Sequence, residues 1–160
     1  MTIRRVSAKD VDHVQQILYL AIGWNTPAGL PPLEEAMKHP ELEKYFVEWG
    51  RPGDDGCIAE LDGEFVGGAV YRLFTDEVHG YGYLASDVPE LGIGIIADQR
   101  GKGLGRRLME CLAGIARGAD IAQLSLSVNK PNPARHLYSK LGYRTVSDDG
   151  DSLVMVLDLS

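Results

Sequence analysis

Two residue types that often build small or metal-bound proteins are scarce here. The chain of 160 residues holds two cysteines, Cys57 and Cys111, far apart and without a Cys-x-x-Cys pattern. We therefore expect no disulfide scaffold, because small stapled domains carry cysteines at short spacings. The four histidines do not pair with other metal-binding residue types at a recognised ligand spacing, so we also expect no metal site.

Long hydrophobic runs are also missing. No apolar stretch reaches the roughly 18 residues that crossing a bilayer requires, and the first residues lack the pattern of a signal peptide. We therefore expect a cytoplasmic protein without a membrane partner. Basic residues are outnumbered by acidic ones, 16 to 23, which gives a net charge of −7. This surplus disfavours nucleic acid as a partner and is compatible with a cationic substrate.

The length and the ordinary globular composition indicate a single domain over residues 1–160. Strand-like and helix-like patterns alternate along it, which predicts an α+β fold with a mixed sheet. The segment 75–89 fits either an irregular loop or an extra hairpin. Predicted strands cover 3–6, 57–61, 65–73, 91–96, 123–128, 143–146 and 152–159, and predicted helices cover 7–23, 33–49 with an interruption at Pro40, 103–117 and 133–141.

A glycine-rich basic loop joins the predicted strand 91–96 to the predicted helix 103–117. It reads Arg100-Gly101-Lys102-Gly103-Leu104-Gly105, followed by Arg106 and Arg107. Free amides at a helix N-terminus attract phosphate, and glycines let the backbone approach the phosphate oxygens closely. The spacing matches neither a P-loop nor a dinucleotide fingerprint. By itself the loop indicates an anion site, and the basic cluster taken without its glycines also fits a solvated helix face.

A second pattern runs from Asn129 to Tyr143 and predicts a short helix that Gly142 ends. Tyr138 shares its turns with apolar residues at three- and four-residue spacing. Taken alone, Tyr138 fits a packed aromatic residue as well as an acid, and Asn132 fits a simple helix cap.

Together the two patterns resemble the GNAT acetyltransferase superfamily. The main signature of that family is Q/R-x-x-G-x-G/A after its fourth strand, and the next block reads roughly N-x-A-x-x-L-Y-x-K-x-G-F/Y. The resemblance implies a mostly antiparallel six- to seven-stranded sheet with about four helices, whose fourth and fifth strands splay apart at a bulge. The matching residues are Arg100, Gly103 and Gly105 in the signature, and Asn132, Ala134, Leu137, Tyr138, Lys140, Gly142 and Tyr143 in the next block.

The resemblance implies that acetyl-CoA is the co-substrate and that no metal takes part. The pantetheine arm would pair with the backbone of the fourth strand at Ile93 and Ile95. Gly92 and Gly94 suit such an approach, because glycine in a strand often marks a bulge or close backbone contact. Asn132 would contact the pantetheine or stabilise its loop. The pyrophosphate would bind the amides and side chains of Arg100, Gly101, Lys102, Gly103, Leu104, Gly105 and Arg106.

The implied reaction is direct transfer of the acetyl group to a small-molecule or peptide amine. An alkyl ammonium must first lose a proton, and a carboxylate can accept it as general base. Glu90, at the head of the fourth strand, is the candidate, with Asp87 and Glu60 as alternatives. Tyr138 matches the general acid of the family, which protonates the departing thiolate. Neither cysteine lies in the signature blocks, which argues against a covalent acetyl-enzyme.

The resemblance places acceptor specificity in residues 24–32 and 75–89. Trp24, Tyr81 and Tyr83 would wall the acceptor pocket, and their rings could hold a cation. These aromatic residues also fit ordinary surface or dimer packing, and a homodimer is compatible with the family. A catalytically silent acyl-CoA-binding or protein-interaction module is the alternative function, and a nucleotide-binding regulator is a third.

Overall fold

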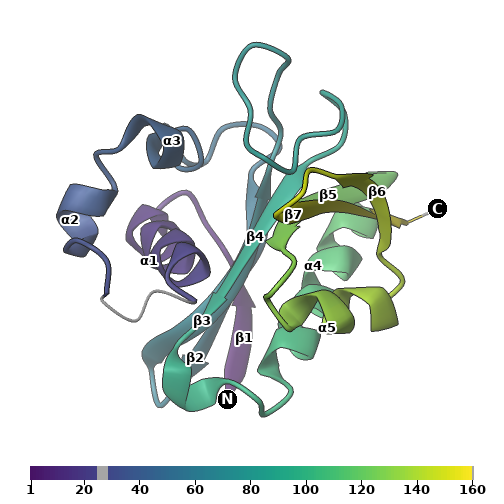
Figure 1. Cartoon of the computed structure of the whole chain (residues 1–160). Coiled ribbons are helices and arrows are strands. Elements are labelled where there is room, and N and C mark those ends of the chain that lie inside the picture. The colour runs from purple at the N-terminus through teal and green to yellow at the C-terminus, as the bar shows by residue number, and fades with distance from the viewer. Residues whose placement is uncertain (25–28, 160) are drawn as a thin grey trace.

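Seven strands form one sheet in the order β1-β2-β3-β4-β5-β7-β6 (Figure 1). The computed structural model describes residues 1–24 and 29–159. Neighbouring strands pair antiparallel except β4 and β5, which are parallel. The predicted mixed, mostly antiparallel sheet is therefore confirmed. The strands are β1 (Thr2–Arg5), β2 (Asp55–Leu61), β3 (Glu64–Arg72), β4 (Glu90–Ile95), β5 (Gln123–Asn129), β6 (Arg144–Asp148) and β7 (Ser152–Asp158).

Helices cover both faces of this sheet, as Figure 1 shows. On one face α1 packs on β3 and β4, and its buried residues Val14, Ile17 and Leu18 belong to a smaller core. On the other face α4 packs on β2 and β3, and its apolar side lies in the larger core. The helices are α1 (Val11–Ile22), α2 (Leu33–Ala36), α3 (Pro40–Glu43), α4 (Leu104–Gly118) and α5 (Ala134–Lys140), with a 3₁₀ turn at Ala97–Gln99.

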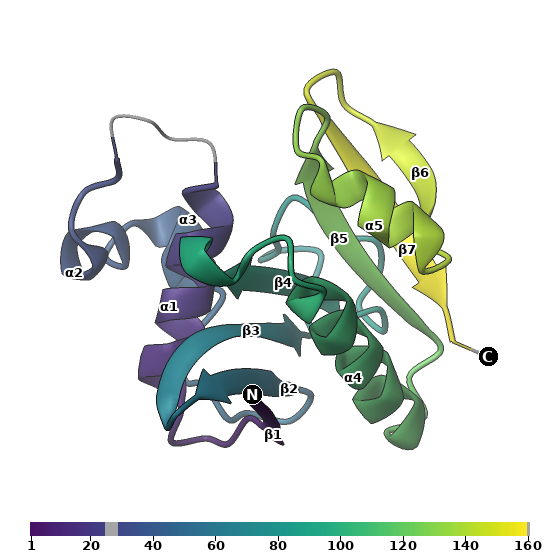
Figure 2. The same cartoon turned by 90° about the horizontal axis from the view of Figure 1, so that it is seen from below.

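The β4 and β5 strands diverge soon after they meet. Their ladder consists of one pair, Glu90 with Ser125, beside which the Ser125 amide donates to the Pro89 carbonyl at 3.0 Å. Figure 2 shows the β1–β4 part of the sheet turning away from the β5–β7 part. The predicted splay is confirmed. The expected bulge is not found in the β3–β4 ladder, whose register runs without a shift from Gly67–Ile95 to Arg72–Glu90.

The structure refines three predicted segments, and in 75–89 it selects one of the two alternatives. The helix predicted over 33–49 consists of α2, α3 and turns, because Pro40 cannot continue a helix and instead begins α3. The segment 75–89 is an irregular loop that projects beyond β3 and β4, teal in Figure 1. Helix α1 begins after Asp10, three residues later than the Ser7 cap would suggest, because Ser7 and Asp10 bond to each other in a tight turn.

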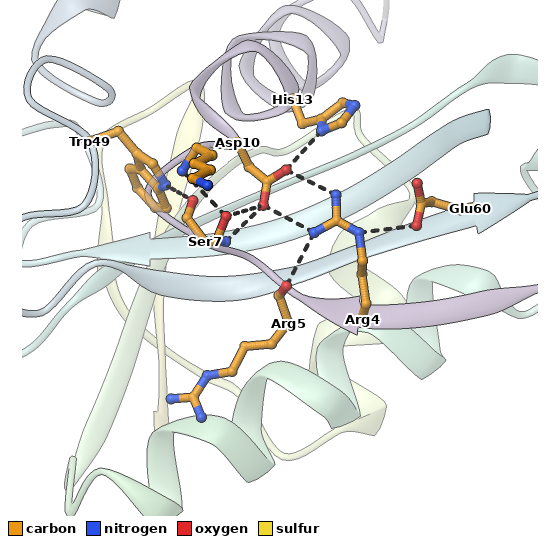
Figure 3. A network of polar contacts seen from close by, with 8 residues as sticks. Arg4, Arg5, Ser7, Asp10, His13, Trp49 and Glu60 are labelled. Carbon is orange, nitrogen blue, oxygen red and sulfur yellow. Dashed lines mark hydrogen bonds and ion pairs between the residues drawn. The ribbon is translucent and has the colours of Figure 1, made fainter. Parts of the chain in front are cut away.

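A polar network fixes this turn before α1 (Figure 3). The buried Asp10 carboxylate accepts two hydrogen bonds from Arg4 at 2.9 and 3.0 Å, one from the Ser7 amide at 2.7 Å, and a contact from His13 at 3.1 Å. Arg4 also bonds Glu60 on β2 at 3.0 Å. The Arg4 guanidinium, the largest of these influences, holds the pKa of Asp10 well below its usual range. The network attaches the start of α1 to the edge of the sheet.

A buried ion pair supports the segment between α3 and β2. The Arg72 guanidinium donates to Asp54 at 2.7 and 2.9 Å, and to the carbonyls of Lys44 and Val47 at 3.1 and 2.8 Å. Both side chains are at most 2% exposed, and Arg72 lies over the Trp49 ring. Arg72 therefore holds in place the residues that follow α3, which contribute to the site below.

Candidate active site

The glycine loop before α4 has the backbone that its glycines permit. Gly101 and Gly103 adopt φ values of +73° and +86°, in the left-handed region that other residues avoid. A Cβ added to either glycine would have no protein atom within 4 Å, so backbone conformation rather than crowding requires glycine here. Gly105 differs, because an added Cβ would touch Leu137 and Ile95. The loop thus curls in front of α4 with open space beside it.

The N-terminus of α4 presents donors without acceptors. Gly103 provides no side-chain cap, and the first turn contains no acidic residue. In the described part of the chain, the backbone amides of 101–106 donate to no other protein group. Uncapped amides combined with the helix dipole form an anion site. These amides suit the pyrophosphate that the sequence predicts there.

The basic side chains of the loop hold different positions. Arg100 turns back and donates from Nε to the Ile95 carbonyl at 2.9 Å, which ties the loop to the end of β4. Lys102 is exposed, and Arg106 is exposed and forms an i,i+4 pair with Glu110 at 2.9 Å. All three residues are within or next to the segment 101–106 in sequence. Each can add a charge-assisted bond to an anion bound by the uncapped amides.

The free edge of β4 lies between this loop and the head of the strand. Backbone groups of residues i and i+2 point to the same edge of a strand. The Pro89 carbonyl points toward β5, where it bonds Ser125. The backbone groups of Ile93 and Ile95, four and six residues further on, share that edge, where the Ile95 carbonyl accepts from Arg100 Nε. β5 does not pair with them. An extended molecule could add to this edge.

The glycines of β4 serve packing as well. A Cβ on Gly94 would lie 2.4 Å from the Ile17 carbonyl oxygen of α1, so α1 can approach β4 only at a glycine. Gly92 is less crowded, with one atom at 4.0 Å, and it lines the pocket described next.

A pocket of about 340 Å³ opens at the head of β4. Its walls come from helices α1 and α3, from Trp24 shortly after α1, from the 75–89 loop, and from the diverging strands β4 and β5. It combines an apolar side with a few polar groups, as ligand pockets commonly do. The lining residues are Leu18, Ala21, Ile22, Trp24, Glu41, Leu42, Tyr45, Tyr81, Glu90, Leu91, Gly92, Ser127, Val128, Asn129 and Asn132.

Glu90 is the buried carboxylate of this pocket, and 5% of the residue is exposed. Its Oε2 accepts a hydrogen bond from the Tyr45 hydroxyl at 2.9 Å. Its Oε1 is buried and has no partner within the described residues. Burial raises the pKa of Glu90 above its usual range, while the bond from Tyr45 opposes that rise. A carboxylate with a raised pKa in a pocket is a candidate proton acceptor.

Two of the three predicted acceptor residues share this pocket. Trp24 and Tyr81 line it, and Tyr81 is 75% exposed. Trp24 and Tyr81 also line a neighbouring cavity that includes Asp151, so these two side chains lie between the pocket and that cavity. The third, Tyr83, lies outside the pocket, where it stacks on His79 and donates to Asp76. The rest of the predicted acceptor loop, 25–28, lies outside the described residues.

Asn132 lies both at the start of α5 and in the wall of the pocket. Its Oδ1 accepts a hydrogen bond from the Ala134 amide at 3.0 Å, which caps α5, and the residue also lines the pocket. Ser127 and Asn129 of β5 stand beside it. They were not predicted, because the alternating pattern of β5 does not show which face meets the pocket.

Tyr138 lies in α5, buried at 6% exposure in the larger core beside Tyr143. Burial raises its pKa to about 12, so its hydroxyl keeps its proton at neutral pH. Among the described residues that line the pocket, Tyr138 does not appear. Its position fits packing, and the geometry by itself does not bring it to Glu90.

The alternative bases are less well placed. Glu60 accepts its bond from Arg4 on the β1–β2 edge, and Asp87 is exposed in the 75–89 loop. Neither lines the pocket, whereas Glu90 does. Tyr45, which the sequence reasoning missed, contacts Glu90 across 45 positions in the chain. No local pattern could have revealed that contact, because it depends on how the 75–89 loop and the residues after α3 pack together.

Two features are absent from the residues that the structure describes. No helix there combines the length and apolar character that membrane crossing requires. No group of three or more histidine, cysteine, aspartate or glutamate residues in that part of the chain could hold a metal ion.

Several solved structures share the fold of this chain. The PaiA N-acetyltransferase of Thermoplasma acidophilum in complex with coenzyme A aligns at a TM-score of 0.69 and 16% identity, over 99% of both chains. YncA of Salmonella typhimurium, a putative acetyltransferase with acetyl-CoA, aligns at 0.71 and 21%, over 100% of this chain and 94% of that one. The ribosomal-protein-alanine N-acetyltransferase of Brucella melitensis aligns at 0.68 and 25%, over 99% and 100%.

Sequence comparison identifies the family. No curated protein matches the chain significantly. A profile described as the acetyltransferase (GNAT) family matches residues 22–143, which include the pocket wall at Trp24, the glycine loop and helix α5. Because the match covers well over half of the chain and the fold agrees, the chain belongs to the GNAT acetyltransferase family.

Proposed function

We propose that this protein transfers an acetyl group from acetyl-CoA directly to an amine. The observation that carries the proposal is the arrangement along β4. An anion site of uncapped amides follows one end of the strand, a buried carboxylate in a pocket stands at the other, and a free backbone edge lies between them. A molecule with phosphates at one end and a reactive acyl group at the other suits this arrangement.

The residues of the glycine loop fit the pyrophosphate of CoA. The amides of 101–106 have no protein acceptor, and the positive φ of Gly101 and Gly103 leaves their approach open. Arg100, Lys102 and Arg106 add positive charge. The backbone of Ile93 and Ile95 would bond the pantetheine arm. The related PaiA structure is a complex with coenzyme A and the YncA structure is a complex with acetyl-CoA, which supports the same co-substrate here.

Glu90 would accept the proton of the attacking amine, directly or through one water. Its raised pKa brings it closer to working pH than an exposed carboxylate. The amine nitrogen then forms an amide bond to the acetyl carbon as the carbon–sulfur bond breaks. A backbone N–H of β4 polarises the carbonyl oxygen, and the departing sulfur takes a proton from Tyr138. The pKa of about 12 keeps Tyr138 protonated until that step.

Trp24 and Tyr81 would form the mouth of the acceptor site. Aromatic faces favour a cation, so they suit an ammonium group on its way to Glu90. The net charge of −7 agrees with a cationic acceptor. Two relatives are named as N-acetyltransferases, which supports nitrogen as the acceptor atom.

The decisive experiment mixes protein, acetyl-CoA and a panel of polyamines, aminoglycosides, amino acids and peptides, and follows the release of CoA thiol. We expect release with at least one amine, together with a mass increase of one acetyl group on that amine. Binding of CoA without turnover on any amine would instead identify a silent acyl-CoA-binding module. Equal thermal stabilisation by ATP, NAD and acetyl-CoA would argue for a nucleotide-binding regulator.

A further inference from the structure

Tyr45 is the side chain that holds Glu90. It follows α3, and its hydroxyl donates to Glu90 Oε2 at 2.9 Å. Its ring packs edge-on against Phe74, with 5.3 Å between ring centroids. The residue before it is tied to the buried Arg72 through the Lys44 carbonyl at 3.1 Å. Tyr45 is therefore restrained by its ring and its backbone, and its hydroxyl can fix the direction of the Glu90 carboxylate.

The two oxygens of Glu90 are not equivalent. Oε2 is bonded to Tyr45, while Oε1 is buried without a partner in the described residues. The backbone amides of Gly82 and Gly80 lie near the carboxylate and lower its pKa, but neither forms a hydrogen bond of good geometry with Oε1. An unsatisfied carboxylate oxygen is costly in a protein interior, so Oε1 favours a donor from a bound molecule or a water. The oxygen that Tyr45 leaves free is the one available for the proton of an amine or of a bridging water.

The 75–89 loop is moulded around this pair. A Cβ on Gly80 would lie 1.8 Å from the Tyr45 hydroxyl oxygen and 2.6 Å from Glu90 Oε2. A Cβ on Gly82 would lie 2.7 Å from backbone atoms of Leu126 and Ser127 and 3.1 Å from Glu90 Cγ. Glycines at both positions let the loop close over the bond between Tyr45 and Glu90 without displacing it.

We propose that Tyr45 is a positioning residue of the acetyl transfer, one that holds Glu90 by Oε2 and so presents Oε1 as the proton-accepting atom. This inference rests on the proposed role of Glu90 as base. Tyr45 lines the same pocket, but it acts through Glu90 and takes no proton itself, because burial beside that carboxylate raises the pKa of its phenol.

Other charged groups around Glu90 are accounted for elsewhere. Arg72, its cross-strand neighbour on β3, is committed to Asp54. Lys44 pairs with Glu41, which lines the pocket. His79 in the loop contacts the Gly80 carbonyl at 2.8 Å. The test below therefore separates His79 from Glu90.

The test compares the wild type with Tyr45→Phe in the pH dependence of kcat/KM, with the best amine of the panel. At low pH, kcat/KM falls as Glu90 becomes protonated, and this fall is the acidic limb of the profile. Removing one hydrogen bond to the carboxylate favours its protonated form, so we expect the acidic limb to move upward by about one pH unit. The rate at neutral pH falls and recovers in part at high pH, and the affinity for CoA is unchanged. A merely structural role would lower the rate at all pH values without moving the limb.

Gly80→Ala provides a second variant in which the tyrosine remains. The added Cβ displaces the hydroxyl, so the acidic limb should move in the same direction as in Tyr45→Phe. Three controls should leave the limb in place: Tyr71→Phe removes another buried phenol hydroxyl, Gly114→Ala adds a methyl group in open space on α4, and His79→Gln removes the neighbouring histidine.

The possible outcomes distinguish the positioning role of Tyr45 from the proposed acetyltransferase function on which it rests. If the wild type turns over and the limb of Tyr45→Phe coincides with its own, the positioning role is refuted while the transferase function stands. If His79→Gln abolishes the limb, the titrating group is His79 and the inference also fails. If no amine is acetylated by the wild type, the proposed function has failed first.

Discussion

A carboxyl group inside a protein ionises only as far as its neighbours compensate for lost water. At Glu90 burial raises the pKa, while one phenol hydroxyl and the tight glycine loop hold the side chain in place. Tyr138 experiences the same burial, and its raised pKa keeps the phenol protonated. At the scale of single residues, burial thus moves the pKa of Glu90 toward neutral pH and the pKa of Tyr138 away from it.

Replacing Glu90 tests the acceptor. We expect Glu90→Gln to lower kcat by about 10²- to 10⁴-fold, the usual contribution of a general base, because the amide cannot take a proton. The wild-type rate should rise with pH through the pKa of Glu90, which lies above that of an ordinary glutamate, and be lost below it. This rise should be absent in the variant. The control is Glu60→Gln, and an equal loss there would contradict the assignment to Glu90.

Replacing Tyr138 tests the acid. Tyr138→Phe keeps the packing in the larger core and removes only the hydroxyl, so we expect kcat to fall by about 10²-fold with little change in CoA affinity. Isothermal titration with CoA and steady-state kinetics measure the two quantities. Tyr143→Phe removes an adjacent buried hydroxyl and serves as the comparison. A loss of stability without a specific loss of kcat would show that Tyr138 only packs.

At the scale of elements, the loop between β4 and α4 both turns the chain and exposes the first amides of α4. Positive φ at Gly101 and Gly103 turns the chain, and the same turn leaves the first amides of α4 facing outward. A side-chain cap would satisfy those amides and weaken the anion site. The absence of a cap in this described helix therefore agrees with binding a phosphate group.

Gly103→Val should weaken CoA binding by more than tenfold. The substitution forces a β-branched residue into φ of +86° and places its methyl groups where phosphate must approach. Gly150→Val is the matched control, since Gly150 has φ of +91° and equally open surroundings in the β6–β7 turn. Both variants should lose similar stability, but only the first should lose affinity. Equal affinities would refute the placement of the pyrophosphate.

At the scale of the whole molecule, the sheet has a hydrophobic core on each face and a seam, which is the place where β4 and β5 meet. The smaller core lies under α1, the larger core lies under α4, and β4 and β5 meet at a single pair between Glu90 and Ser125. The pocket opens where the two strands part. Segments from α1 to β5 reach this seam, so the site depends on the correct assembly of most of the chain.

The buried pair of Arg72 and Asp54 tests how strongly that assembly depends on one contact. We expect Asp54→Ala to lower the free energy of unfolding by about 3–5 kcal/mol, because it leaves a buried guanidinium without its counter-charge. Urea denaturation measures the change. Glu110→Ala breaks the exposed pair with Arg106 and should cost about 0.5 kcal/mol or less. Similar values for both variants would mean that water replaces Asp54.

Elements with a strong local pattern were predicted well. Helix α4 followed from its apolar spacing, and the loop before it from glycines that few other residues could replace. The short helices α2 and α3 were predicted as one interrupted helix, because the composition of 33–49 is helical. Tertiary hydrogen bonds from Arg72 hold the residues after α3 in turns instead. Trp24 and Tyr81 share the Glu90 pocket, whereas Tyr83 bonds Asp76 instead.

The sequence alone determined the order of the elements and the loop suited to an anion, because these depend on periodicity and on local backbone freedom, and its motifs carried the resemblance to the GNAT family. Only the tertiary structure decided which side chains meet. The bond from Tyr45 to Glu90 joins residues 45 positions apart, and the closeness of Gly80 and Gly82 to that bond depends on how a patternless loop packs. Such contacts follow from the packing of distant segments, which no local pattern specifies.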